Sequence, residues 1–162
     1  KKARENADIV IVSCHWGIEY DYYPNTFQKN MAKQLADAGA DVIIGTHTHT
    51  LQDVEYIQRA DGKRTLVAYS LGNFVSGMLE ESCQLEGMLS FDIEKKKIKN
   101  VVFTPLVNYY TLTGKRERHD FSVYRLKDYT NKLVEKHGFP NLTISHMKEE
   151  VKQKVKNIKI DM

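Results

Sequence analysis

The sequence predicts an α/β fold, because two strand-like runs flank a segment with helical spacing. Residues 7–13 form a mainly apolar, β-branched run, and residues 42–44 form a second run of the same kind. Between them, within residues 25–38, apolar residues recur every four positions, which puts them on one face of a helix. A strand, a helix and a strand in this order nearly always form two parallel neighbours with a right-handed crossover.

The ends of these elements carry recognisable signals. The helix begins at Asn25, where Gln28 three positions later completes a capping box, and it ends at Gly39. The first strand is expected to be covered on both faces, because its apolar residues are continuous rather than alternating. The apolar face of the helix is expected to consist of three large side chains, Phe27, Met31 and Leu35.

The rest of the chain predicts two hairpins, further strands and two helices. The first hairpin turns over Asp61 and Gly62, and the second turns over residues 94–97, whose lysines are expected to be solvated. Pro140 and the glycine before it separate the last two helices. The expected ranges are hairpin strands at 54–57 with 65–69 and at 85–93 with 98–103, a short strand at 107–110, a polar loop at 113–120, a strand at 121–126, and helices at 127–137 and 145–159.

Length and composition fit one globular domain over residues 1–162. With 41% hydrophobic residues, the chain can form a single core, which we assign to residues 7–112, followed by a C-terminal strand and helices in residues 113–162. The net charge of +3, from 24 basic and 21 acidic side chains, indicates neither a nucleic-acid partner nor a membrane surface. Cys14 and Cys83 match neither a disulfide scaffold nor a Cys-x-x-Cys metal motif.

The beginning of the chain favours a preceding segment. The sequence starts without Met, lacks the apolar core of a signal peptide after Lys1, and reaches a strand almost at once. No apolar run approaches the roughly 20 residues that span a bilayer. We therefore expect any targeting signal or membrane anchor to lie upstream of Lys1.

Histidines follow both strands of the predicted parallel pair. His15 comes directly after the first strand, and His47 and His49 follow the second, two positions apart. Open α/β sheets bind ligands at the carboxyl ends of their strands, so we expect the three imidazoles to meet in one crevice. Imidazole is a ligand of Zn, Mn and Fe, although carboxylates or an Asn are needed to complete such a site. Taken singly, each histidine is equally compatible with a structural or surface role.

Other residues are candidates to line this crevice. Gly72 would let the backbone approach a bound group closely, and Asn73 follows it with a polar side chain. Glu19 is the best local carboxylate to support a ligand or contact a substrate, with a solvated loop charge as the alternative. Asp41 lies at the wrong end of its strand. We assign no catalytic residue, and we expect the other histidines to lie on the surface: His119, His137 and His146.

Three motifs carry a family resemblance. They are His15-Trp16-Gly17-Ile18-Glu19-Tyr20, the run at residues 38–45 that leads into His47-Thr48-His49, and Tyr69-Ser70-Leu71-Gly72-Asn73-Phe74. In this order, over residues 7–75, they resemble the C-terminal half of the CapA-type poly-γ-glutamate capsule biosynthesis proteins. That family is related to the calcineurin-like metallophosphoesterases.

The resemblance implies a fold and a ligand set. The fold would be part of an αββα sandwich with C-terminal helices, with two metal ions at the strand ends. His15 and His47 would bind one metal and His49 the other, while Gly72 and Asn73 would lie in a turn that lines the site. The family usually carries His at position 46 and Pro at position 48, where this chain has threonines. Both departures spare the implied ligands.

The family's upstream Gly-Asp and Asn-Asn-His segments have no counterpart in this sequence. They would supply the bridging carboxylate, an Asn ligand and a catalytic His. Without them the metal charge would face neutral imidazoles only. We therefore expect this chain alone to be inactive and to bind two metals weakly.

Two functions follow from the resemblance. The first is a metal-dependent, phosphoesterase-like hydrolase that uses Mn, Fe or Zn in the intact protein and acts with the capsule synthesis machinery on poly-γ-glutamate or a phosphoester. The second is a non-catalytic cell-surface protein that binds, exports or anchors the anionic polymer, with Lys115, Arg116 and Arg118 as a candidate contact. In both cases the protein would face outward from the cell, anchored to the membrane through a segment outside this sequence.

Overall fold

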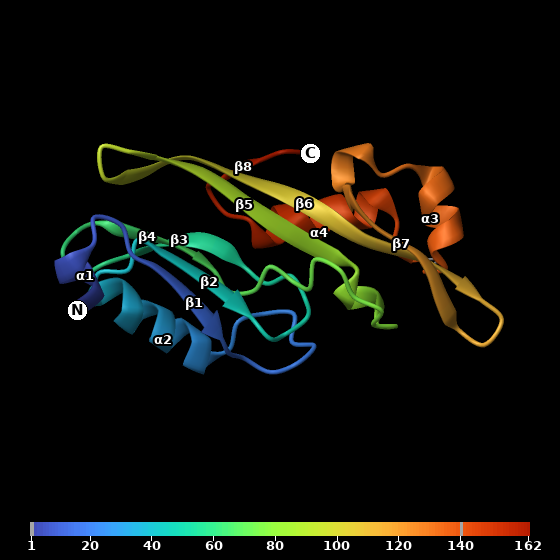
Figure 1. Ribbon diagram of the computed structural model, residues 1–162, viewed down its shortest axis with the longest axis horizontal. Helices are drawn as coiled ribbons and strands as arrows, with labels where there is room; N and C mark the ends of the chain where they lie inside the picture. The colour runs from blue at the N-terminus through green and yellow to red at the C-terminus, as the bar shows by residue number, and fades with distance from the viewer. Residues whose placement is uncertain (1, 140) are drawn as a thin grey trace.

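The chain folds around two β-sheets with helices beside them, which confirms the predicted α/β class (Figure 1). The structure is a computed structural model that describes residues 2–139 and 141–162, so the predicted helix separator Pro140 lies outside the described residues. A short helix, α1 (Lys2–Asn6), precedes the first strand and was not predicted. Within the described ranges, no helix is long and apolar enough to cross a membrane.

The first sheet contains the predicted strand-helix-strand unit. Its strands are β1 (Ile11–His15), β2 (Val42–Thr46), β3 (Val54–Gln58) and β4 (Arg64–Ala68), in the order β1-β2-β4-β3. β1, β2 and β4 are parallel to one another, and β3 is antiparallel to β4, as expected for a hairpin. The helix α2 (Thr26–Asp37) makes the crossover from β1 to β2.

Two expectations for this unit were wrong in detail. The buried face of α2 consists of Gln28, Ala32 and Ala36; of the three expected side chains, Met31 and Leu35 pack partly buried against the core and Phe27 is 60% exposed. Small alanines let the helix approach the sheet closely and leave the larger side chains at the edges of the contact. The first strand is not covered on both faces either, because Ile11, Ser13 and His15 on one face are exposed while Val12 and Cys14 on the other pack against the core.

The second sheet is built from longer strands than the sequence predicts. It contains β5 (Leu85–Glu94), β6 (Lys97–Thr113), β7 (Glu117–Arg125) and β8 (Lys159–Ile160). β6 replaces two expected short strands, and it continues through Pro105 opposite Gly87. The expected polar loop at residues 113–120 is instead a tight turn that leads into β7, so antiparallel pairing with β6 prevails over local polarity.

The C-terminal helices are shorter than expected. A 3-10 turn (Leu126–Asp128) precedes α3 (Asn131–His137), and α4 (Ile144–Lys154) ends where the chain becomes extended. After that end, β8 pairs with β6 and Val155 forms a bridge with Val54 of β3. A further 3-10 turn (Glu81–Cys83) precedes β5. The end of the chain therefore contacts both sheets.

One hydrophobic core joins the two sheets and α4. Leu51 follows the first sheet, Phe103 lies in β6, and Met147 and Val151 come from α4, and all of them belong to one buried cluster. Gly87 of β5 makes room for this core, because a Cβ there would lie 2.3 Å from the Phe103 ring of the neighbouring strand β6 and 3.5 Å from the Leu51 Cδ1. A smaller cluster holds α2 on the first sheet. Because both sheets share a core, we expect them to unfold together.

Met147→Ala tests this shared core. Met147 is fully buried among side chains from both sheets, and truncating a buried Met costs about 2–5 kcal/mol in the free energy of unfolding. We expect a single urea transition, followed by circular dichroism, that moves to a lower urea concentration. The control is Met88→Ala, at an exposed position in β5, which should change little. Two separate transitions would contradict a common core.

Candidate functional site

Three strand ends meet around Gly45. Trp16 follows β1 and its Nε1 donates a 2.9 Å hydrogen bond to the carbonyl oxygen of Tyr69, which follows β4. Gly45 of β2 lies between them, where a Cβ would be 1.9 Å from the Tyr69 oxygen and 2.4 Å from the Trp16 Nε1. Only glycine permits this approach. The residues that follow β1, β2 and β4 are thereby brought to one edge of the sheet.

The structure brings His15, His47 and His49 together at this edge. The ring centroids of His15 and His47 are 4.4 Å apart, and those of His47 and His49 are 6.4 Å apart. His15 is exposed, while His47 and His49 are half-buried. Thr46 stands opposite His15 in the register, and its Oγ1 lies 3.5 Å from the His15 Nδ1. The role of these imidazoles as metal ligands stays a prediction.

Asn73 and Glu19 flank His49 on its two ring nitrogens. The Nδ1 of His49 lies 2.7 Å from the Oδ1 of Asn73, and because a carbonyl oxygen only accepts, Nδ1 is the donor. In the neutral ring Nε2 is then left with a free lone pair. Glu19 is 54% exposed along its side chain and its Oε1 lies 3.5 Å from that Nε2. Asn73 thus orients the histidine and Glu19 faces its free nitrogen.

The backbone around the histidines is strained. His47 and His49 have φ angles of 104° and 64°, and the neighbouring Tyr20 and Phe74 have φ angles of 69° and 73°. Such conformations cost about 1–3 kcal/mol each and gather at sites where a side chain must be aimed. Thr48, fully buried between the two histidines, fixes the segment: its carbonyl accepts from the Tyr20 amide at 2.8 Å and its Oγ1 donates to the Thr50 carbonyl at 3.1 Å.

A buried amide network, which the sequence did not reveal, supports the loop that follows β1. Gln28 donates through Nε2 to the Oε1 of Gln52 at 2.8 Å, and Gln52 donates to the Asp21 carbonyl at 2.9 Å. Thr50 donates to the same carbonyl at 2.6 Å. Gln28 also completes the predicted capping box with Asn25. Gln28 is four positions before Ala32 and therefore lies on the same face of the helix, which was the one sign in the sequence that it could be buried.

Glu86 lies beneath the turn that carries Asn73, which the sequence also did not reveal. It is fully buried in β5, and its Cγ would be 3.0 Å from a Cβ at Gly72, whose φ is +82°. Burial raises the pKa of the Glu86 carboxyl to about 8, and the backbone amides of Phe74 and Asn73 only partly oppose this shift. Neither carboxyl oxygen reaches a partner in the described chain at hydrogen-bonding geometry. The carboxyl is therefore mainly neutral near pH 7.

The other candidates lie elsewhere. His119 and His146 are exposed as expected, but the surface position predicted for His137 was wrong. His137 is buried among aromatic rings, with its Nδ1 2.8 Å from the Tyr129 hydroxyl, and burial lowers its pKa to about 4. The aromatic rings of Tyr109, Tyr110 and Phe139 surround it, which a sequence pattern cannot show. Cys14 and Cys83 are free thiols, in agreement with the absence of a disulfide scaffold.

The imidazole cluster supplies only part of a metal site. Imidazole nitrogens suit Mn, Fe and Zn, so the donor chemistry fits these ions. However, no group of three or more His, Cys, Asp and Glu side chains within residues 2–139 and 141–162 is arranged to hold a metal ion. Glu19 is the carboxylate that contacts the cluster, and it is mostly exposed. The described residues could supply the nitrogen ligands of a metal site, and its carboxylate ligands would have to come from other groups.

The fold and the cluster define an α/β protein whose imidazoles converge at the carboxyl edge of a parallel sheet. Residues 1–78 match the family described as bacterial capsule synthesis protein PGA_cap. The chain is 36% identical over 105 residues to the "PGA biosynthesis protein CapA" of Bacillus subtilis (strain 168), an alignment that covers 65% of the chain and 26% of that relative. It is 49% identical over 70 residues to the "Capsule biosynthesis protein CapA" of Bacillus anthracis, covering 43% of the chain and 16% of the relative.

The comparisons therefore support a CapA-like capsule biosynthesis fragment, and the family match lies in residues 1–78. This confirms the resemblance that the three motifs indicated, and the α/β architecture is consistent with the metallophosphoesterase-like fold expected from it. The matched segments span about a quarter and about a sixth of the two relatives, 26% and 16%. All three motifs with their histidines and Asn73 fall within residues 1–78.

Asn73→Ala tests how His49 is oriented. Without the Oδ1 acceptor, the His49 ring loses the partner that keeps the proton on Nδ1. We expect ¹⁵N NMR of the imidazole to show the Nδ1-protonated tautomer in the original protein and a mixture of tautomers in the variant. The control, Asn141→Ala, makes the same chemical change at an exposed position. An unchanged His49 spectrum in Asn73→Ala would show that another group holds the ring.

Proposed function

We propose that the protein to which this chain belongs is a metal-dependent, phosphoesterase-like hydrolase of capsule biosynthesis. The observation that carries this proposal is the approach of three imidazoles from two strand ends, with one of them oriented by an amide. Positive φ angles at both His47 and His49, beside the similarly strained Tyr20 and Phe74, also support a functional role, because such conformations tend to cluster at functional sites. The family match supports the setting in capsule synthesis.

Each residue of the cluster has a distinct task in this proposal. His15 and His47, with rings 4.4 Å apart, would share one metal ion, and His49 would bind a second through Nε2. Asn73 holds the His49 ring through Nδ1. Glu19, near the His49 Nε2, could accept a proton or a hydrogen bond from the substrate. When bound, Mn, Fe or Zn would activate water and neutralise charge on a phosphoryl-like oxygen. The anionic ligands would come from residues outside those described here.

The substrate and location are proposed from the same considerations. The names of the two CapA relatives refer to capsule or PGA biosynthesis, so we propose poly-γ-glutamate, or a phosphoester formed during its synthesis, as the substrate. The partner would be the capsule synthesis machinery. The protein would act at the cell surface, facing outward, with its membrane anchor in another segment.

His47→Ala in the full-length protein tests the proposal. His47 lies between the other two imidazoles, so its removal should lower both the metal content and the hydrolysis of a phosphodiester or γ-glutamyl substrate by at least about ten-fold. Metal content is measured by mass spectrometry after loading with Mn²⁺, and turnover is measured on the same samples.

The matched control is His119→Ala, which removes an exposed imidazole in β7 and should change neither quantity. Equal metal content in the original protein and His47→Ala would exclude the imidazole cluster as the metal site. Metal bound by the original protein without turnover of either substrate would refute the hydrolase and leave a binding role.

A further inference from the structure

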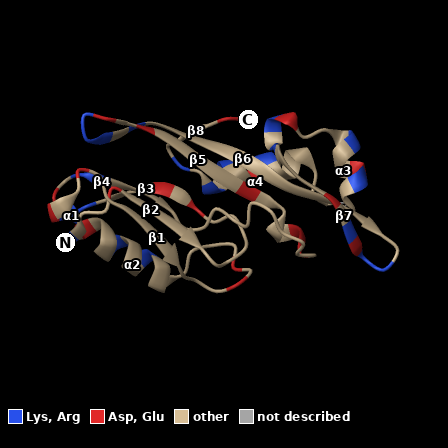
Figure 2. Cartoon of the chain, viewed as in Figure 1, with Lys and Arg blue, Asp and Glu red and all other residues tan. Residues whose placement is uncertain are grey.

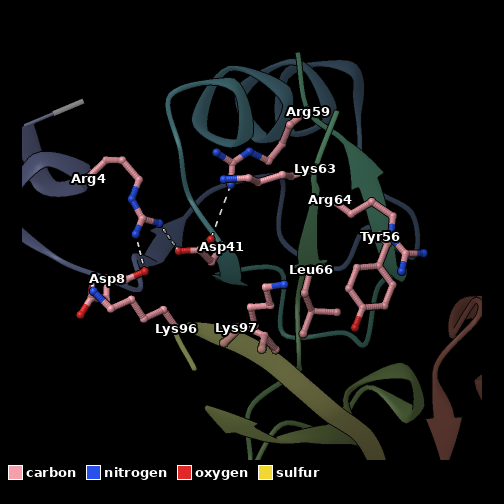
Figure 3. Close-up of a pocket in the computed structure, with 11 residues that line it drawn as sticks. Arg4, Asp8, Asp41, Tyr56, Arg59, Lys63, Arg64, Leu66, Lys96 and Lys97 are labelled. Atoms are coloured by element: carbon pink, nitrogen blue, oxygen red, sulfur yellow. Dashed lines mark hydrogen bonds and ion pairs between the residues drawn. The ribbon is translucent and has the colours of Figure 1, made fainter. Parts of the chain in front are cut away.

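A basic cleft lies at the opposite edge of the first sheet from the histidines. It has a volume of about 560 Å³, and Figure 3 shows side chains from separate segments around it. α1, the turn between β3 and β4, and the turn between β5 and β6 all contribute to its walls. Six of the lining side chains are basic: Arg4, Arg59, Lys63, Arg64, Lys96 and Lys97.

Acidic groups of the chain neutralise only part of this charge. Two lining carboxylates, Asp8 and Asp41, face the six cations, and Asp61 beside the cleft contacts Arg59 and Lys63, which leaves an excess of three positive charges. Arg4 lies 2.6 Å from Asp41, and Lys96 lies 2.7 Å from Asp8. Arg59 adds a contact of 3.5 Å to Asp41. The basic side chains of the cleft therefore already pair with carboxylates of the chain itself, and some of them remain without such a partner in the described chain.

Three of the cations, Arg64, Lys63 and Lys97, have no close acidic partner among the residues that the structure describes. The guanidinium of Arg64 lies over the Tyr56 ring at 4.7 Å from the centroid. The nearest carboxylate to Lys63, that of Asp61, is 3.9 Å away, and Lys97 forms no ion pair within the part of the chain that the structure describes. These three side chains are available to an incoming anion.

Arg59 is a buried and largely paired basic residue of the cleft wall. It is 8% exposed, and its Nη2 lies 2.8 Å from the Asp61 carboxylate. Its Nε has no hydrogen-bond partner among the described residues. This Nε is closed off from solvent, so an incoming anion would meet the other basic side chains of the cleft first.

We infer that this cleft binds a flexible acidic chain that carries several carboxylates. Contacts to Lys63, Arg64 and Lys97 at the same time require more than one anionic group. The cleft is also lined by Tyr56, Leu66 and Ile98. These apolar surfaces suit the methylene groups of glutamate side chains better than a phosphate chain, which has none. The site goes beyond the proposed hydrolase, because no histidine of the cluster lines it.

The cleft does not include the basic segment at Lys115 and Arg116, which the sequence offered as a contact for an anionic polymer. Lys115 and Arg116 lie in the exposed turn between β6 and β7, and Figure 2 shows basic residues at that tip and at the β5–β6 tip. Only the second of these tips reaches the cleft, through Lys96 and Lys97. The two basic segments can therefore be tested against each other.

The test compares two double variants of the full-length protein. Lys63→Gln with Lys97→Gln removes two cleft cations that hold no close ion pair, and Lys115→Gln with Arg116→Gln removes the same charge at the other tip. The probe is a fluorescently labelled glutamate oligomer, followed by anisotropy at increasing salt. We expect the cleft variant to bind about ten-fold more weakly or worse, with a shallower salt dependence, and the control to change less than about two-fold.

Each other outcome contradicts the inference. Equal binding by the cleft variant, or an equal loss in the control, would show that the polymer is held elsewhere or by net charge alone. Inorganic polyphosphate is the competing probe, and its binding to the cleft in place of the glutamate oligomer would overturn the carboxylate assignment. Thermal melts of both variants exclude unfolding as the cause of a loss. Binding of the glutamate oligomer should persist in His47→Ala. The inference about the cleft would then stand even if the proposed hydrolase activity were refuted.

Discussion

The close contact of three strand ends at Gly45 is the constraint on which the site depends. The Trp16 indole and the Tyr69 carbonyl can meet at 2.9 Å only because no side chain stands between them. Each of these residues precedes a segment of the site by a few positions, so their contact sets the distance between the segments. A larger residue at position 45 would separate β1 from β4 and carry His15 away from Asn73.

The strain at the site is sustained by polar contacts buried beneath it. His47 and His49 adopt left-handed backbone conformations, yet Thr48 between them is fully buried and hydrogen-bonded. Gln28 and Gln52 extend these contacts from the helix α2 to the loop after β1. Satisfied hydrogen bonds in a buried network are costly to break, which keeps neighbouring strained residues from relaxing. The backbone thus holds the imidazoles in their observed orientations.

The strand-helix-strand unit could be predicted from the sequence, because the signals that define it come from residues close together in the chain. The capping box at Asn25 and the crossover to residues 42–44 depend on neighbouring residues and on chain handedness. The buried face of α2, the length of β6 and the burial of His137 depend on packing partners distant in sequence. The meeting of the histidines could be predicted from strand order, whereas Glu86 and the Gln28 network carry no motif.

The antiparallel strand β3 explains why one sheet carries two different sites. β2 ends at the carboxyl edge, where the loop to β3 contains His47 and His49. β3 then runs back, so its turn to β4 delivers Arg59, Lys63 and Arg64 to the opposite edge (Figure 1). β4 returns in the direction of β2 and brings the Asn73 turn beside the histidines. A direct crossover from β2 to β4 would supply the imidazole edge alone, whereas the hairpin adds the cations at the opposite edge.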